Sequence, residues 1–184
     1  QFDASGHGIL ITRSKVLSKY TTTLVNAEPI TSKFGERIED FLNAEISLGT
    51  VTTKADALQW IRYTFMYQRC PDDLAQMQRI DNAATSLNEN KMIRLFIATD
   101  SLQPTHLGQV ASMHYIPFTA VKHFNENLTG DMDPSQLLDC IFSSGMFSSL
   151  IVRNNELDEL SSFTPVITLL TPPDELPGKV NVLF

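Results

Sequence analysis

The sequence has few of the residues that mark disulfide-rich, membrane or disordered chains. It contains two cysteines in 184 residues, too few to stabilise a fold of this size by disulfides, so we expect free thiols. No apolar run approaches the roughly 18 residues needed to span a bilayer. The apolar fraction of 42% and the charged fraction of 19% are typical of a folded globular chain and exclude general disorder.

Basic residues are also scarce. The chain has 14 Lys and Arg against 21 Asp and Glu, a net charge of -7, so its overall field repels nucleic-acid phosphates. Any contact with DNA or RNA must therefore come from a local patch. The first residues lack the charged-then-apolar pattern of a signal peptide, which together with free thiols favours an intracellular protein.

Motifs for nucleotide binding are missing. Gly6-His7-Gly8 lacks the third glycine of a dinucleotide fingerprint, and it precedes a predicted strand instead of following one. Gly178-Lys179 is followed by valine, where a Walker motif requires Ser or Thr. We therefore do not expect this chain alone to bind ATP.

Residues that could serve as metal ligands or catalysts have simpler explanations. His106 and His114 lack a third ligand, and neither cysteine belongs to a Cys-x-x-Cys pair, so a metal site is not expected. Cys140 lies in the apolar stripe of a predicted helix, where we interpret it as a small buried hydrophobe. Asp131 and Asp133 lie in a turn, and helix capping and solvation explain them better than acid–base catalysis.

Hydrophobic spacing predicts a short buried strand at residues 9–12, followed by a mainly α chain. The elements expected after it are helices near 34–48, 53–69, 72–88, 105–113 and 118–127, with a strand at 92–98 and a turn at 100–104. In helix 72–88, Leu74 and Leu87 are expected on the buried face. Three helices, a strand, a turn and a polar return follow the element order of a winged-helix domain.

The composition changes at residues 127–133, a polar and turn-rich stretch that indicates a domain boundary. Asp133 and Pro134 then begin a helix, and another is expected near 155–163. Residues 164–178 contain four prolines and no helical period, so we expect an ordered loop or an extended connector. The apolar run that ends the chain suggests truncation.

The charges of the predicted helices argue against a winged helix that reads DNA. Helix 72–88 and its flanks carry four acidic residues against Arg79 alone, so they cannot neutralise phosphates. The preceding helix is mildly basic and bears polar-tipped aromatics. Its candidate domain-interface residues are Trp60, Arg62, Tyr63, Tyr67 and Arg69. An ordinary solvated face with core aromatics is the alternative that these residues leave open.

The run FLNAEISLGTVTTKADALQWIRYTFMYQR, residues 41–69, resembles a stretch of the Ski-type superfamily-two helicases with DExH motors. This group includes the spliceosomal, activating-signal-cointegrator and meiotic crossover helicases. Three more segments resemble the family in order and spacing: QFDASGHGILIT, THLGQVASMHYIPFTAVKHF and FSSLIVRNNELDEL. Gln109 stands where the family usually has arginine, and Cys70-Pro71 replaces a longer loop. These departures leave the paralogue open.

The resemblance implies a mainly α fold in three parts. Residues 1–28 would be the terminal strand and linker of a second RecA-like motor domain. Residues 29–126 would form a winged-helix domain of three helices and a small β wing. Residues 127–184 would begin a helical bundle.

The resemblance also implies a function, which is to couple the motor domains of an ATP-dependent RNA or DNA helicase to a bundle that ratchets the strand. The partners would be the motor domains, the remaining bundle and, through the parent protein, RNA or DNA, but no membrane. ATP and Mg²⁺ would bind outside residues 1–184, and the protein would be nuclear. A self-contained winged-helix adaptor for a protein partner or duplex DNA, and a catalytically inactive platform, remain as alternatives.

Overall fold

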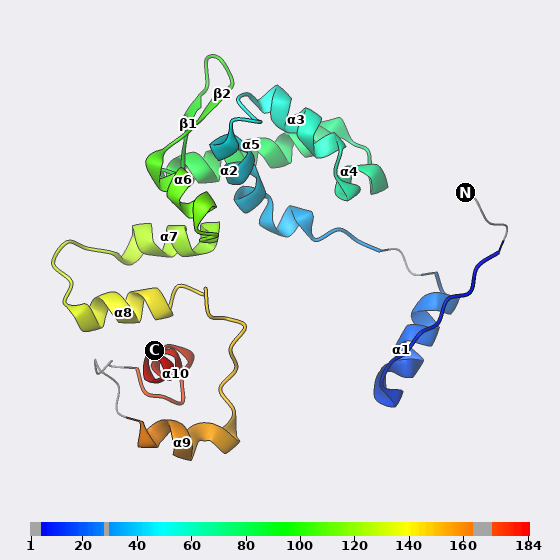
Figure 1. Cartoon of the computed structure of the whole chain (residues 1–184). Coiled ribbons are helices and arrows are strands. Elements are labelled where there is room, and N and C mark those ends of the chain that lie inside the picture. The colour runs from blue at the N-terminus through cyan, green and yellow to red at the C-terminus, as the bar shows by residue number, and fades with distance from the viewer. Residues whose placement is uncertain (1–4, 28–29, 164–170) are drawn as a thin grey trace. The chain divides into compact units, whose positions relative to one another are not determined.

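The computed structural model describes residues 5–27, 30–163 and 171–184. The chain divides into two compact units, Gln1–Ser32 and Lys33–Phe184. Secondary structure is mainly helical, as the sequence predicts (Figure 1). No helix in the described stretches is long and apolar enough to cross a membrane.

The first unit contains one helix, α1 (Ser14–Val25), and none of its residues is buried. The strand predicted at residues 9–12 is wrong, because this segment has no regular secondary structure. Ile9 and Ile11 are 88% and 91% exposed. A strand must pair its backbone groups with a neighbouring strand, and the described part of this unit provides none.

The second unit begins with the helices of a winged helix. These are the short 3-10 helix η1 (Phe34–Arg37) and the helices α2 (Ile38–Leu48), α3 (Lys54–Arg62), α4 (Phe65–Arg69) and α5 (Asp73–Glu89). A capping box opens α3: Thr53 Oγ1 accepts from the Asp56 N–H at 3.1 Å, and the Asp56 carboxylate accepts from the Thr53 N–H at 2.9 Å. Gly49 ends α2 in the left-handed conformation at φ 78°.

The wing is a two-stranded hairpin. β1 (Ile93–Phe96) pairs antiparallel with β2 (Ser101–Pro104), with Leu95 opposite Leu102. Thr53 adds an isolated bridge to β2 through Ser101. This bridge links the wing to the start of α3.

One core joins the winged-helix elements. Its buried residues come from α2, α3, α5, the wing, and the following helices α6 (His106–Met113) and α7 (Phe118–Asn127). The largest fully buried side chains are Leu42, Ile46, Ile61, Ile80, Leu87, Met92, Ile93, Leu102 and Val51. Leu87 is buried as predicted, but Leu74 is 81% exposed, so the prediction for Leu74 is wrong. Leu74 lies in the first turn of α5, before the buried stripe that includes Ile80.

Two segments that carry the family resemblance meet inside this core. Asn43 of α2 is 2% exposed, and its Nδ2 donates to the carbonyl of Gly108 in α6 at 2.9 Å. A Cβ at Gly108 would lie 2.0 Å from the Met92 carbonyl oxygen and 2.7 Å from Asn43 Oδ1. Glycine is therefore required where α6 crosses this site.

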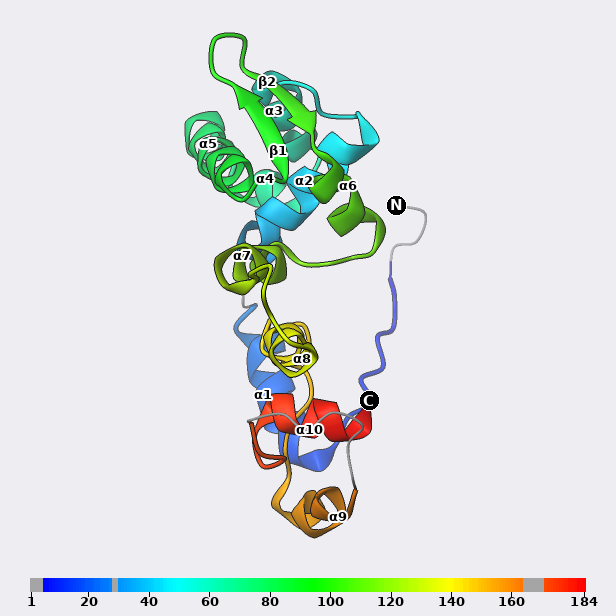
Figure 2. The same ribbon diagram turned by 90° about the vertical axis from the view of Figure 1, so that its left-hand side faces the viewer.

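The C-terminal helices form a smaller assembly. They are α8 (Pro134–Phe142), the 3-10 helix η2 (Asn154–Glu156), α9 (Leu157–Ser162) and α10 (Leu176–Leu183). The helix start predicted at Asp133 and Pro134 is confirmed, and Asp133 forms a capping box with Gln136. Helices α8 and α10 lie side by side (Figures 1 and 2) and share a core of Phe142 and Val180.

The prediction of a loop or connector at 164–178 is wrong at its C-terminal end. There α10 begins at Leu176, with Pro177 at a first-turn position where its missing N–H costs no hydrogen bond. Residues 164–170 lie outside the described residues. Of the last apolar run, Val180 is buried in α10, whereas Leu183 and Phe184 are exposed. The neighbouring Lys179 donates to the Ile151 carbonyl at 2.7 Å and pairs with Glu156.

Candidate functional site

The candidate interface residues lie at the corner where α3, α4 and α5 meet, which we call the α3–α5 corner (residues 60–74). The prediction of a single helix at 53–69 is wrong, because the structure has two helices, α3 and α4, which are separated at Thr64. The Thr64 hydroxyl donates to the Ile61 carbonyl at 2.6 Å and accepts from the Tyr67 N–H at 3.3 Å. Threonine at this position thus ends one helix and caps the next, which turns α4 toward α5.

Asp73 joins two of the candidate residues. Arg62 donates from Nε to Oδ1 at 3.1 Å and from Nη2 to Oδ2 at 2.5 Å, and the Tyr67 hydroxyl donates to Oδ1 at 2.8 Å. Hydrogen bonds from Arg62, then from Tyr67, lower the pKa of Asp73. The bond to Asp73 raises the pKa of Tyr67. Because the cluster is exposed, its ion pair adds little to the stability of the fold. We therefore assign it the role of orienting the side chains of Arg62 and Tyr67.

The other candidate residues are not part of this cluster. Trp60 is half-buried, with its ring 5.3 Å from Phe34 at an interplanar angle of 56°. Tyr63 is 81% exposed beyond the end of α3, and Arg69 is exposed at the end of α4. Tyr63 and Arg69 are thus exposed to solvent, whereas Trp60 packs against Phe34. Their role at a domain interface stays a prediction.

The basic residues of α3 are neutralised within the winged helix. Lys54 Nζ lies 2.8 Å from Asp81 Oδ1 and 3.3 Å from Asp100 Oδ1. The hydrogen bond to Asp81 is the main cause that raises the pKa of Lys54. With Arg62 on Asp73, both cations of α3 pair with acidic residues of α5 or the wing, so neither is available to bind phosphates.

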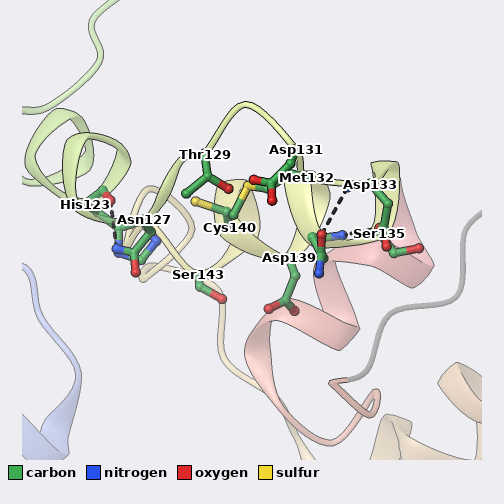
Figure 3. A pocket seen from close by; sticks show the side chains of 11 residues that line it. His123, Asn127, Thr129, Asp131, Met132, Asp133, Ser135, Asp139, Cys140 and Ser143 are labelled. Carbon is green, nitrogen blue, oxygen red and sulfur yellow. Dashed lines mark hydrogen bonds between the residues drawn. The ribbon is translucent and has the colours of Figure 1, made fainter.

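A pocket of about 790 Å³, which no sequence pattern predicts, lies between α7 and α8 (Figure 3). Its lining residues are His123, Asn127, Thr129, Asp131, Met132, Asp133, Ser135, Gln136, Asp139, Cys140 and Ser143. Because these residues lie on two helices and the turn between them, only the packing of the helices brings them together.

Two carboxylates of this pocket have structural partners. Asp133 caps α8 by accepting from the Gln136 N–H at 2.9 Å, and Asp139 accepts from Thr171 Oγ1 at 2.8 Å. Cys140 is buried as predicted, and burial raises the pKa of its thiol, which disfavours the thiolate form. In the described part of the chain, no group of three or more His, Cys, Asp and Glu side chains could hold a metal ion.

Comparison with known families agrees with this architecture. The family described as "Winged Helix-turn-helix domain" matches residues 31–86, and "Sec63 Brl domain" matches residues 104–184. The chain is thus a mainly α protein that joins a winged helix to Sec63-type helices. The domain boundaries inferred from the sequence stay predictions.

Three similar relatives extend the match over the whole chain. The chain is 33% identical to "DExH-box ATP-dependent RNA helicase DExH14" of Arabidopsis thaliana, over 100% of this chain and 10% of that protein. It is 34% and 32% identical to "Activating signal cointegrator 1 complex subunit 3" of Gallus gallus and Homo sapiens, over 100% of this chain and 9% of each. The chain belongs to the Ski-type DExH helicase family, as a segment with winged-helix and Sec63 domains, and spans about a tenth of these relatives.

Proposed function

We propose that this chain is the strut of an ATP-dependent RNA or DNA helicase, and that its winged helix holds the motor domains against the helical bundle. The observation that carries the proposal is the internal neutralisation of α3. Lys54 and Arg62 pair with Asp81 and Asp73 of α5, the helix that would have to approach a duplex in a DNA-reading winged helix.

The exposed side chains of the α3–α5 corner support a contact with protein. Tyr63 and Leu74 are each 81% exposed, and Phe65 is 50% exposed. Exposed tyrosines and apolar side chains near an arginine are typical of interface centres. We propose that another domain of the parent helicase covers this corner. In the same proposal, ATP and Mg²⁺ bind the motor domains outside residues 1–184, and the parent protein is nuclear.

The first test uses the full-length protein that contains this chain. Tyr63→Ser and Leu74→Ser should lower the length of duplex unwound per ATP hydrolysed while leaving ATP hydrolysis largely intact, because they weaken a contact between domains and not the motor. Leu48→Ser is the matched control, since Leu48 is 74% exposed at the end of α2, outside the corner. Equal unwinding per ATP in all three variants would contradict the strut.

The second test uses the chain alone. It should neither hydrolyse ATP nor bind duplex DNA, as measured by phosphate release and by fluorescence anisotropy. Salt-dependent duplex binding that disappears with Arg62→Ala and Arg69→Ala would instead support the self-contained adaptor.

A further inference from the structure

Some cations of the second unit have no carboxylate partner in the described residues. Arg37, Lys54, Arg62 and Lys179 all form ion pairs. Lys33, Arg69 and Arg79 are exposed and form none within residues 5–27, 30–163 and 171–184. Because the chain is acidic overall, such unpaired cations matter most where they gather.

We call the set of Lys33, Arg69 and Arg79 the η1 patch, because Lys33 directly precedes η1, Arg79 lies against Gly35 of η1, and Arg69 follows on α4, which also contacts Gly35. Arg79 of α5 places Nη1 2.9 Å from where a Cβ of Gly35 would lie, and Met66 Sδ of α4 lies 3.4 Å from the same point. Arg69 follows Met66 by three residues and so shares its face of α4. Lys33 precedes Gly35 by two residues. Because Gly35 has no side chain, the Arg79 guanidinium can pass close to the backbone of η1.

A row of aromatic rings lies beside the η1 patch. Phe34, between Lys33 and Gly35, stacks on Phe41 with centroids 4.8 Å apart and an interplanar angle of 10°. Trp60 contacts the same ring from α3. Phe41 remains 38% exposed, with the Arg37 guanidinium over its ring at 5.8 Å from the centroid. Cations beside partly exposed aromatic rings are the combination that binds single-stranded nucleic acid, since the cations contact phosphates and the rings contact bases.

We propose that the η1 patch is a contact site for the sugar-phosphate backbone of single-stranded RNA or DNA. The carboxylates on η1 and the first turn of α2 are Glu36, Glu39 and Asp40, and Asp40 is already paired with Arg37 at 2.9 Å. A single strand is flexible enough to follow a patch of three cations. A rigid duplex would also carry phosphates past the acidic residues of α5. This contact goes beyond the strut and can fail without affecting it.

The test is the salt dependence of binding between the chain and a labelled single strand of about 20 nucleotides, measured by fluorescence anisotropy. Each phosphate contact contributes about -0.7 to the slope of log affinity against log salt concentration. Three contacts therefore predict a slope near -2, or about a 20-fold loss of affinity between roughly 50 and 200 mM salt. Arg79→Ala, Arg69→Ala and Lys33→Ala should each reduce the slope by about 0.7. Lys122→Ala, an exposed cation on α7, should leave it unchanged.

Gly35→Ala separates geometry from charge. The added Cβ would displace the Arg79 guanidinium, so affinity should fall although the net charge stays the same. Trp60 fluorescence and circular dichroism would check that every variant is folded.

Three results would overturn the proposal. They are no binding at low salt, an equal loss in Lys122→Ala and Arg79→Ala, or competition by a polyglutamate peptide as effective as that by the unlabelled strand. The last result would assign the η1 patch to an acidic protein partner.

Discussion

The winged helix and the C-terminal helices of the same unit are stabilised in different ways. The winged-helix core contains 15 buried hydrophobic residues drawn from helices, wing and connections. The core between α8 and α10 contains two, Phe142 and Val180. Polar contacts supplement the smaller core, including the buried Lys179 with its Glu156 partner and the Thr171 bond to Asp139. The first region should therefore unfold as a cooperative block, and the second should depend on a few contacts.

The chain offers separate probes for the two regions. Its one tryptophan, Trp60, lies in the winged helix, so fluorescence follows that region, whereas circular dichroism follows all helices. Urea unfolding recorded with both probes would show whether the regions unfold together or apart.

The largest effect is expected from Gly108→Ala. Its Cβ would lie 2.0 Å from the Met92 carbonyl oxygen, so α2, α6 and the start of β1 would have to separate. We expect a loss of about 3 kcal/mol or more in the unfolding free energy of the winged helix, measured by Trp60 fluorescence in urea. Gly130→Ala is the control, because its Cβ meets no atom within 4 Å. A loss below about 1 kcal/mol would contradict the close packing.

Gly178→Ala is the matching change in the C-terminal region. Its Cβ would lie 2.0 Å from the Pro172 carbonyl oxygen. Because the core beneath α10 is small, α10 can move away, and we expect a smaller loss of about 2 kcal/mol. Circular dichroism should record an earlier loss of helix, while the Trp60 transition stays in place. A parallel shift of both signals would show that the two regions form one cooperative unit.

The ion pair of Lys179 predicts a pH effect confined to the C-terminal region. Hydrogen bonds from Lys179, and then from the Arg153 N–H, lower the pKa of Glu156 in the folded state. This stabilisation is present above the unfolded-state pKa of about 4.3 and is lost as the pH falls through the lower folded-state pKa. The dichroism midpoint in urea should fall at acidic pH, and Lys179→Met should reduce that dependence. An unchanged pH profile in Lys179→Met would exclude the pair as its source.

The smallest effect is expected from Asp73→Asn at the α3–α5 corner. The exposed cluster adds little stability, so the Trp60 unfolding midpoint should stay nearly unchanged. The pKa of Tyr67 should fall toward its ordinary value, since its acceptor loses the negative charge. Ultraviolet titration of wild type against the variant measures this change. A large loss of stability would instead make the cluster a structural clamp.

Sequence patterns located most of the helices because their signals are local. Thr53 with Asp56 and Asp133 with Gln136, for example, form capping boxes within four residues of sequence. The pattern failed at Thr64, where a threonine inside an apolar-periodic stretch ended a helix. It also failed at residues 9–12, because β-branched residues favour a strand only where another strand can pair with it.

The candidate residues show the same division. Residue type and spacing mark Arg62 and Tyr67 as candidate interface residues. They do not show that both side chains bind Asp73. In the sequence, Arg79 stands out only as the lone cation of an acidic helix. Its place over Gly35 depends on how α5 packs against η1, which no spacing along one helix reveals.

The sequence by itself determined the family, the mainly α fold and the capped ends of several helices. Motif order and composition can be read along the chain, and helix capping depends on residues only a few positions apart. Only the tertiary structure decided which charges are neutralised and which remain unpaired. That depends on residues far apart in the chain, such as Lys54 with Asp81, or Gly35 with Arg79. Packing between helices therefore placed the unpaired cations of an acidic chain beside its aromatic row.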